Sequence, residues 1–379
     1  MKLSQWTHSE KWICTKSNTH GNNKKLILLF ADRFVLEKQK DVYTSLKELH
    51  PNSDIISVST SGQINDANVY DNESVATVIE FEKSSYKIDA VEHNSTLSSS
   101  QVGAEFVKKI NPDHLKHLLI FSEGTDINGS DLTNSLSDFF GEKTSITGGI
   151  AGDGVRFQKT LVGWNDYLSP NLVVVVGLYG EDLKIGFGEK GGFETFGLTK
   201  TITKSKKNEL FEIDNQNAIE LYKKYLGKFG ENLAKSSLYF PLSVQIDEKK
   251  DCFVRTILSV DEEAKKMTFA GNIPEGAQVR LMRTNIENLL ISAGEAAHKA
   301  HLKNSNNEEE LVLIVSCIGR KIILESSVEE EIEEVRDAIN NPNASYTGFY
   351  SYGEISSNPD FKGCDLYNQT MTITTIHED

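Results

Sequence analysis

The chain has 379 residues, of which 38% are hydrophobic and 25% are charged, so we expect a globular protein with two domains. Its 55 acidic residues outnumber its 40 basic ones and give a formal net charge of −15. This excess argues against nucleic acid and against an anionic membrane surface as partners, because both need clustered lysine and arginine.

Neither export nor membrane insertion is expected. No apolar run is long enough to span a bilayer, and the polar segment 1–23 lacks the apolar core of a signal peptide. The cysteines lie far apart and form no CxxC pair: Cys14, Cys252, Cys317 and Cys364. Such cysteines indicate reduced thiols in a cytoplasmic protein.

Strands and helices alternate in the first half of the chain. Short apolar or alternating runs predict strands at 25–30, 54–58, 75–81 and 118–121. Apolar residues at helical spacing predict helices at 42–49, 98–110 and 131–140. The run at 172–178 is β-branched and apolar on both faces, which predicts a central strand buried on both sides.

The polar stretch at 204–208 (KSKKN) indicates a domain boundary by its composition. We therefore expect an N-terminal extension at 1–23, a first domain at 24–208 and a second at 209–379. Helices are predicted in the second half at 218–226, 286–298 and 328–339. Strands are predicted there at 238–245, 254–260, 266–270, 311–317 and 366–376. The expected fold is α/β, with two closely associated domains and mixed, largely antiparallel sheets flanked by helices.

Five glutamates within 329–334 belong to the helix predicted at 328–339. Its apolar stripe lies on another face, so we interpret the glutamates as a solvated face and not as a metal site. Ser327 and Glu330 have the spacing of a capping box at its start.

The densest glycine cluster, GGIAGDG, lies at 148–154. Glycine permits close backbone approach, so Gly149, Asp153 and Gly154 are candidates for a turn that faces a ligand. A tight turn between sheet elements is the alternative. Nucleotide binding is disfavoured because no GK[ST] follows and because 155–164 is predicted to be a strand.

The segment SCIGR at 316–320 ends a buried strand, which is where ligands of α/β sheets usually lie. Arg320 can clamp a carboxylate with two hydrogen bonds, or it forms an ordinary ion pair. Cys317 would be a nucleophile if a histidine lowered its pKa, but no sequence signature supplies that partner.

Two further segments carry recognition chemistry. In GFYSYGEI at 348–355, a single strand would put Tyr350, Tyr352 and Glu354 on one face, where two rings and a carboxylate can enclose an ammonium group. Cross-strand packing is the alternative. The last predicted strand carries Asn368 and Gln369, whose amides suit a small polar ligand.

Catalytic motifs are otherwise sparse. The pairs His114/His117 and His298/His301 lack the HExxH context, and we interpret them as surface or helix-face residues. The sequence has no GxSxG elbow and no calcium-binding loop.

Six segments in this order resemble the FIST family: GGIAGDG (148–154), LVVVVGLYG (172–180), IDNQNAIELYKKYLG (213–227), SCIGR (316–320), GFYSYGEI (348–355) and CDLYNQTMTI (364–373). That family pairs an N-terminal with a C-terminal FIST domain, and the resemblance extends from Lys24 to the C-terminus. It implies a sensory module of bacterial and archaeal signal transduction that binds small ligands such as amino acids. Such modules work with histidine kinases, cyclic-dinucleotide enzymes or chemotaxis receptors.

One position departs from the family pattern. The closing motif usually has histidine before Asn-Gln-Thr, where this chain has Tyr367. A branch that resembles this chain is a haem-containing nitric-oxide sensor controlling a kinase in trans. Tyr367 removes an imidazole there, although a tyrosinate can also ligate haem iron. We therefore expect no cofactor and no metal, with haem as the alternative.

The expected function is that of a cytoplasmic sensory protein, not an enzyme, which binds an amino-acid-like or other small polar molecule. A histidine kinase or other signalling protein would receive the signal in trans, because no output domain is recognisable in the sequence. Arg320 would meet a ligand carboxylate and Glu354 a ligand amine. The expected ligand-binding residues are Gly149, Asp153, Gly154, Cys317, Arg320, Tyr350, Tyr352, Glu354, Tyr367, Asn368 and Gln369. A haem-based nitric-oxide sensor and an enzyme using Cys317 are the alternatives.

Overall fold

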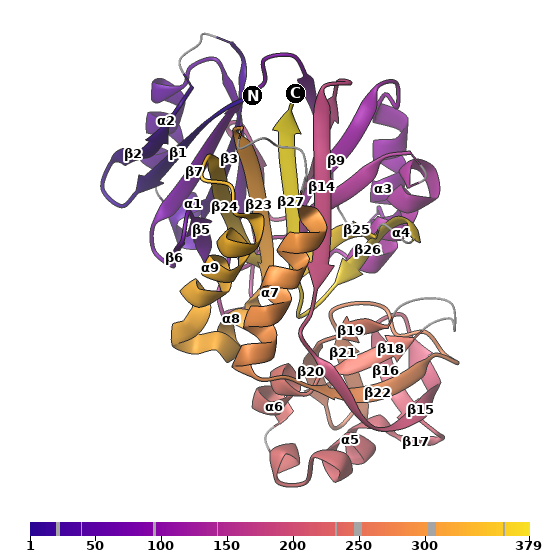
Figure 1. The fold of residues 1–379 in the computed structure, drawn as a ribbon. Coiled ribbons are helices and arrows are strands. Elements are labelled where there is room, and N and C mark those ends of the chain that lie inside the picture. The colour runs from indigo at the N-terminus through magenta and orange to yellow at the C-terminus, as the bar shows by residue number, and fades with distance from the viewer. Residues whose placement is uncertain are drawn as a thin grey trace.

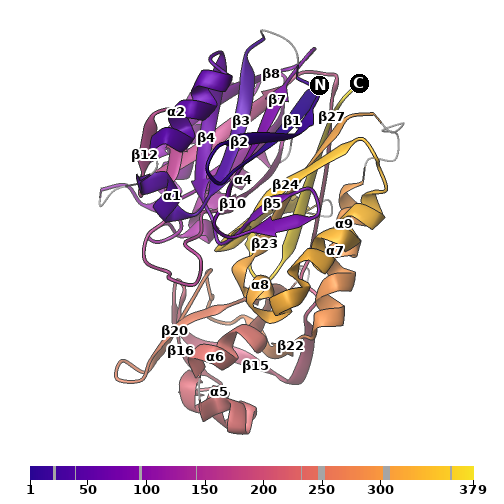
Figure 2. The ribbon, with the colours of Figure 1, turned by 90° about the vertical axis from the view of Figure 1, so that its left-hand side faces the viewer.

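A large body holds both chain ends, and a smaller lower lobe formed by residues 194–283 lies beneath it (Figures 1 and 2). The structure, a computed structural model, describes residues 1–19, 23–38, 40–93, 96–141, 143–231, 233–245, 252–301, 308–358 and 361–379. None of the helices in these ranges is long and apolar enough to cross a membrane. The α/β fold class is confirmed.

Three sheets build the body. The strands of the first sheet pair in the order β12 (Tyr167–Ser169), β11 (Val162–Trp164), β4 (Ser53–Ser59), β3 (Lys25–Ala31), β7 (Ser74–Glu80), β1 (Lys2–His8) and β2 (Trp12–Ser17). Those of the second pair in the order β26 (Phe361–Tyr367), β25 (Gly353–Asn358), β10 (Ser145–Ile150), β9 (Leu115–Ser122), β13 (Leu172–Tyr179) and β8 (Ser85–Glu92). Those of the third pair in the order β6 (Asn68–Tyr70), β5 (Gln63–Asn65), β24 (Ala344–Ser351), β23 (Glu310–Cys317), β27 (Met371–Glu378) and β14 (Leu183–Lys190).

The three sheets follow one plan. Each has a central parallel pair, which is β3 with β4, β9 with β10, and β23 with β24. An antiparallel strand flanks the first member of each pair, and a hairpin adds to the second. The hairpin always comes from another part of the chain: β5–β6 extends the third sheet, β11–β12 the first and β25–β26 the second. The body is thus a threefold internal repeat, which the sequence does not reveal.

These exchanges join the two halves of the sequence into one body. Backbone hydrogen bonds also form a ring at the carboxyl ends of the second strands of the three pairs. Gly152 donates to Ser59 at 2.8 Å, Ser61 donates to Tyr350 at 2.8 Å, and Tyr352 donates to Ile150 at 3.2 Å. Each repeat therefore fixes the strand ends of the next, and the sequence boundary between domains does not separate the body.

Helices cover the outer faces of the sheets (Figure 1). Apolar side chains fill the space between the inner faces. The first sheet carries α1 (Arg33–Lys38) and α2 (Lys40–Leu49), and the second carries α3 (Ser99–Lys109) and α4 (Gly129–Phe140). The third carries α7 (Ile286–Ala300) and α9 (Val328–Ile339), and α8 (Ile318–Leu324) follows β23 and packs against α7. At the centre, the ring of Phe30 lies 4.9 Å from that of Phe349 and 6.3 Å from that of Phe121, between centroids. Each sheet contributes one of these rings.

In its described residues, the lower lobe is an antiparallel sheet with two α-helices, α5 (Ala218–Leu226) and α6 (Leu233–Tyr239). Its strands pair in the order β19 (Phe253–Arg255), β18 (Leu242–Gln245), β22 (Gln278–Arg283), β15 (Glu194–Lys206), β16 (Glu209–Ile213), β21 (Lys266–Phe269) and β20 (Ile257–Asp261), and β17 (Gln216–Asn217) pairs with β16.

Two neighbouring crossings connect the lower lobe to the body. Gly191 and Gly192 lead from β14 into β15, and Thr284 leads from β22 towards α7. The Thr284 hydroxyl donates to the Gly192 carbonyl at 2.7 Å, and Gly192 has a φ of +74°, which favours glycine. We call this pair of crossings the hinge.

Most predicted elements are confirmed, and the exceptions lie at turns. β13 lies between β9 and β8 with every residue buried, as its apolar run predicts. The predicted strand at 254–260 is interrupted at Thr256 into β19 and β20, and the one at 366–376 bends at 368–369 between β26 and β27. The predicted strand at 238–245 begins within α6. The segment 155–161 is a loop and not a strand. Lys204–Asn208, where we placed the domain boundary, forms the end of β15 and the turn into β16.

Candidate functional site

A cavity of about 840 Å³ lies between the body and the lower lobe, and we call it the interlobe cavity. On the body side it follows the carboxyl ends of β9, β10 and β23, the edge at which ligands of α/β proteins usually bind. The body lines it with His93, Ser98, Ser99, Gly124, Thr125, Asp126, Ile127, Asn128, Ile150, Phe157, Gln158, Cys317, Ile318, Gly319 and Tyr352. The lower lobe lines it with Lys207, Asn208, Ser237, Leu238, Thr256, Ile257, Leu258, Phe269 and Ala270.

A buried carboxylate shapes the loop after β9. Glu123 is fully buried and accepts hydrogen bonds from the backbone N–H groups of Thr125, Asp126 and Ile127, at 2.7, 3.1 and 2.5 Å. The loop therefore turns around this side chain before α4 begins. No motif in the sequence indicated Glu123. The one available signal was an acidic residue directly after a buried strand.

Two stacked aromatic rings stand at the cavity. The ring of Phe157 lies 4.6 Å from that of Tyr352, with 18° between the ring planes. The Tyr352 hydroxyl donates to the Gly154 carbonyl and accepts from the Phe157 N–H, both at 3.1 Å. Phe157 has a φ of +50° and remains 48% exposed, although it is large and apolar. A strained, exposed aromatic residue at a cavity is typical of a ligand contact.

Asp153 holds the loop that carries Phe157. Its fully buried carboxylate accepts from the Arg33 and Arg156 guanidinium groups at 2.8 and 2.7 Å. It also accepts from the N–H groups of Gln158 and Lys159 at 3.4 and 3.3 Å. Burial alone would raise the pKa of Asp153, but these partners outweigh it and lower the pKa. The predicted role of Asp153 as a ligand contact is therefore corrected to that of a positioning residue.

The lower lobe contributes an unsatisfied polar atom. Thr256 is 6% exposed, and its hydroxyl has no hydrogen-bond partner among the described residues. A buried hydroxyl without a partner costs free energy, on the order of 1–3 kcal/mol. Because Thr256 lines the interlobe cavity, a bound molecule could supply the missing partner.

Cys317 lines the interlobe cavity at the end of β23, and Glu354 on β25 lies buried behind it. The fully buried Glu354 carboxyl accepts from the Ser351 hydroxyl at 2.7 Å and from the Thr370 N–H at 3.2 Å. Burial raises the pKa of Glu354 to about 8, against the opposite effect of hydrogen bonds from Ser351, Thr370 and Cys317. Burial also raises the pKa of the Cys317 thiol well above its usual range, with the charge of Glu354 acting in the same direction. Cys317 is thus a protonated thiol at neutral pH.

Arg320 does not face the interlobe cavity. It is fully buried, and its guanidinium donates to Glu331 at 2.6 Å, to the Gly191 carbonyl at 2.8 Å and to the Leu289 carbonyl at 2.8 Å. The expected pairing with Glu354 is wrong, because Glu331 neutralises this arginine. Glu331 is correspondingly buried, so the prediction of a fully solvated glutamate face on α9 is also wrong at this residue.

Tyr350 belongs to the same network and not to an aromatic cage. Its hydroxyl donates to Glu331 at 2.9 Å, and the Ser316 hydroxyl donates to the same carboxylate oxygen at 3.3 Å. The segment 348–355 is not one strand: β24 ends at Ser351 and β25 begins at Gly353. Because the chain turns at Tyr352, Tyr350 and Tyr352 do not share a face. We call Arg320, Glu331, Tyr350 and Ser316 together the Arg320 network.

The remaining predicted residues lie behind the cavity wall. Gly149 is packed so closely that a Cβ atom there would come within 2.6 Å of Val315. The Gln369 amide donates to the carbonyl of Leu238 at 3.1 Å and thereby links the body to the lower lobe. Asn368 donates to the Tyr367 carbonyl at 2.9 Å in the turn between β26 and β27. Of the predicted ligand residues, Cys317 and Tyr352 line the interlobe cavity, and Gly154 bonds to Tyr352.

Histidine positions bear on the haem alternative. Tyr367, at the family's histidine position, packs its ring 5.9 Å from that of Phe253 and does not line the cavity, so it does not fit an axial ligand. His93 does line it. His117 is fully buried between the Ser145 and Thr147 hydroxyls, which corrects its predicted surface position. No cluster of three metal-ligating side chains occurs among the described residues.

Comparison with protein families settles the chain's relationship. A FIST N domain matches residues 25–216, and a FIST C domain matches residues 218–357. The chain belongs to the FIST family. These two matches confirm the predicted family. FIST domains are sensory domains of signal transduction. The family boundary at 216–218 falls inside the lower lobe, next to β17.

The other comparisons add no functional information. No curated protein matches the sequence. A solved structure of cyanuric acid hydrolase from A. caulinodans is similar over 78% of this chain and 99% of its own chain, with 9% identity and a TM-score of 0.19. A likeness this weak supports no argument about fold or function.

Proposed function

We propose that this FIST protein is a small-ligand sensor that binds its ligand in the interlobe cavity and responds by changing how the lower lobe packs on the body. The proposal rests on the position of the cavity. It lies at the carboxyl ends of three body strands and is closed by a lobe that two adjacent crossings join to the body. Hydrogen bonds from Arg255 to the Leu366 carbonyl and from Gln369 to the Leu238 carbonyl also hold the lobe against the body. A ligand that contacts both sides binds the closed arrangement more tightly and shifts the population towards it.

The lining favours a small molecule with a flat or apolar part and polar groups. Phe157 and Tyr352 offer stacked rings, and Ile150, Ile318 and Leu238 offer apolar contacts. A group that accepts from the Thr256 hydroxyl would satisfy a buried donor that the protein leaves unpaired. An amino acid with an apolar side chain, or a molecule of similar size, has this combination. The signal would pass to a histidine kinase or other cytoplasmic protein in trans.

An enzymatic role for Cys317 is disfavoured. A nucleophilic cysteine needs a lowered pKa, which a histidine, a lysine or an arginine beside it would provide. Burial and Glu354 raise the pKa of this thiol instead. Haem sensing remains the second candidate because His93 lines the cavity, and a Soret band lost on His93→Ala would favour it over the proposal.

A thermal-shift panel of amino acids and related metabolites tests the proposal. Ligand at about 100 times its Kd stabilises the folded state by about 2.7 kcal/mol. We expect at least one compound to raise the Tm of the wild type, and Phe157→Ala to require at least tenfold more of it. Phe139→Ala removes an aromatic ring of similar exposure outside the cavity, 54% against 48%, and serves as the matched control.

Two outcomes would contradict the proposal. In the first, no compound of the panel binds to the wild type. In the second, Phe157→Ala and Phe139→Ala weaken binding equally, which would mean that the interlobe cavity is not the site.

A further inference from the structure

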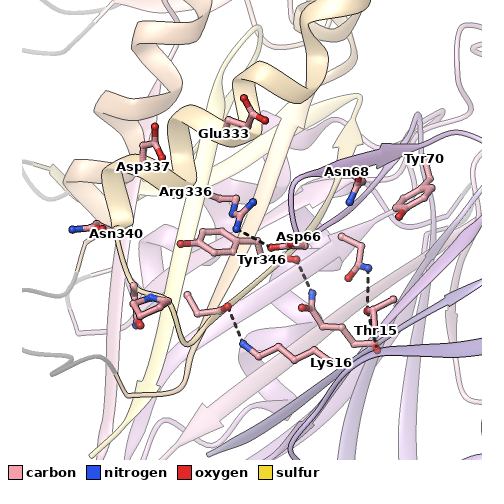
Figure 3. A pocket seen from close by; sticks show the side chains of 15 residues that line it. Thr15, Lys16, Asp66, Asn68, Tyr70, Glu333, Arg336, Asp337, Asn340 and Tyr346 are labelled. Atoms are coloured by element: carbon pink, nitrogen blue, oxygen red, sulfur yellow. Dashed lines mark hydrogen bonds and ion pairs between the residues drawn. The ribbon is translucent and has the colours of Figure 1, made fainter.

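A second cavity of about 810 Å³ lies in the body, between the C-terminal half of α9, the β5–β6 hairpin and β2, and we call it the α9 groove. It shares no lining residue with the interlobe cavity. Figure 3 shows Glu333, Arg336 and Asp337 on α9, Asp66 and Tyr70 on the hairpin, and Lys16 on β2. Neither the sensory role nor the comparisons assign a function to this groove.

The cations of the α9 groove already have partners. The Lys16 ammonium donates to the carbonyls of Asn343 and Ala344 at 2.8 and 2.9 Å. Arg336 lies 3.6 Å from the Asp66 carboxylate and 5.6 Å from the centroid of the Tyr346 ring (Figure 3). An anionic ligand would have to displace these contacts.

The acceptors of the groove are less well satisfied. Glu333 and Asp337 lie one helical turn apart, and neither has an ion pair or hydrogen bond with another described residue. Asp337 lies in the last turn of α9, where the helix dipole is negative and favours cations. The groove thus has two solvent-exposed carboxylates without a partner among the described residues, while its positive charges are occupied.

Asn65 provides independent evidence for a missing donor at the floor of the groove. It is 2% exposed, and its amide nitrogen donates to the Thr15 hydroxyl at 3.3 Å. That hydroxyl donates to the Gln5 carbonyl at 3.2 Å and therefore accepts from the Asn65 amide nitrogen. The Asn65 carbonyl oxygen is then left without a partner among the described residues. A buried acceptor in this state needs a donor from outside the protein.

We propose that the α9 groove binds an aliphatic di- or polyamine. One ammonium group would lie between Glu333 and Asp337, and another would donate to the Asn65 carbonyl oxygen. Tyr70 and Tyr346 line the same groove and can contact an alkyl chain or an ammonium group through their rings.

A metal ion fits the groove less well than an amine. The acidic side chains here do not converge into a set of three that could hold an ion, within the part of the chain that the structure describes. The volume also far exceeds that of one ion and suits a molecule with several separated donors.

Calorimetric titration of the full chain with spermidine tests this site. Asp337→Asn should weaken spermidine binding at least tenfold, and Tyr70→Leu should weaken it several-fold. Glu330→Gln removes the same charge from the same helix but outside the groove, so it should change the affinity less than twofold. The protein carries a net charge of −15, so this control separates the groove from general attraction of cations.

Three results would overturn the proposal. They are no spermidine binding to the wild type, an equal loss in Asp337→Asn and Glu330→Gln, and displacement of spermidine by Mg²⁺ at matched ionic strength. Each variant is checked by circular dichroism, and Phe157→Ala should bind spermidine as the wild type does. The test is therefore independent of the ligand proposed for the interlobe cavity.

Discussion

The Arg320 network and the interlobe cavity both lie at the carboxyl end of β23, yet they differ in whether their polar groups have partners. In the network, the Arg320 guanidinium and the Glu331 carboxylate satisfy each other and the groups around them. In the cavity, the Thr256 hydroxyl lacks a partner among the described residues and Phe157 remains exposed. The comparison shows that a charged residue near a strand end, such as Arg320, indicates a ligand site only when the fold leaves its hydrogen bonds without partners.

The Arg320 network also contacts one crossing between the body and the lower lobe and the helix that follows the other. Arg320 donates to the carbonyl of Gly191 in the hinge and to the carbonyl of Leu289 and the hydroxyl of Ser292 on α7. Both crossings into the lower lobe are thus held close to one buried ion pair. In the proposed mechanism, a ligand in the interlobe cavity would move the lower lobe relative to the body while the Arg320–Glu331 pair stays in place.

The largest expected effect comes from breaking the buried ion pair. Arg320→Met leaves Glu331 buried without its counterion, which should lower the free energy of unfolding by about 3–5 kcal/mol in urea titrations. Arg320→Met combined with Glu331→Leu should recover part of this loss. Glu330→Gln, at the exposed neighbour, should change stability by less than about 0.5 kcal/mol. Equal stability of Arg320→Met and the wild type would contradict the network.

Glu354 should make stability depend on pH. Its folded-state pKa near 8 lies above the usual value of 4.5, so the folded protein keeps a proton that the unfolded chain loses between these values. Stability should therefore fall as pH rises from about 5 to 8, by up to about 4 kcal/mol. Glu354→Gln stays neutral and should flatten this slope, whereas Glu263→Gln at an exposed site should not. An unchanged slope in Glu354→Gln would show that the carboxyl is already ionised.

The loop at 153–159 should exchange its amide hydrogens faster when the Asp153 carboxylate is neutralised. Asp153→Asn weakens charged hydrogen bonds worth about 1.5–3 kcal/mol each. We expect amide hydrogen exchange at Gln158 and Lys159 to become at least tenfold faster, because both donate to this carboxylate. Asp113→Asn, in an exposed turn, is the control. Unchanged exchange would mean that Phe157 is positioned without Asp153.

The smallest expected effect separates two helix starts that look alike in sequence. Ser98 and Gln101 form a capping box in the structure, so Ser98→Ala should cost about 1 kcal/mol. Ser327 precedes α9 with the same spacing to Glu330 but makes no capping bond, so Ser327→Ala should cost less than about 0.5 kcal/mol. Equal losses in thermal unfolding would remove this distinction.

The sequence predicted the elements whose burial is continuous. The apolar run of β13 and the helical stripe of α3 specify their structures locally, and both are confirmed. It missed the turn at Tyr352, because Tyr350, Tyr352 and Glu354 recur at the two-residue spacing of a single strand. It also missed the threefold plan, because equivalent strands share pairing but not residues.

The candidate site was only partly predictable for a related reason. Cys317 and Tyr352 stand at strand ends and could be inferred from position. Whether Arg320 faces a ligand depends on Glu331, which a helical pattern presents as one of several surface glutamates. Thr256 and Phe157 reach the cavity through loops of separate lobes, and no local pattern brings them together.

A crystal structure of the protein with the compound that stabilises it most tests the central claim directly. We expect ligand density in the interlobe cavity, against the Phe157 and Tyr352 rings and within hydrogen-bond distance of the Thr256 hydroxyl. The Arg320–Glu331 pair should be unchanged in that structure. A ligand bound to Arg320 with Glu331 displaced, or a ligand bound outside the interlobe cavity, would contradict the proposed site.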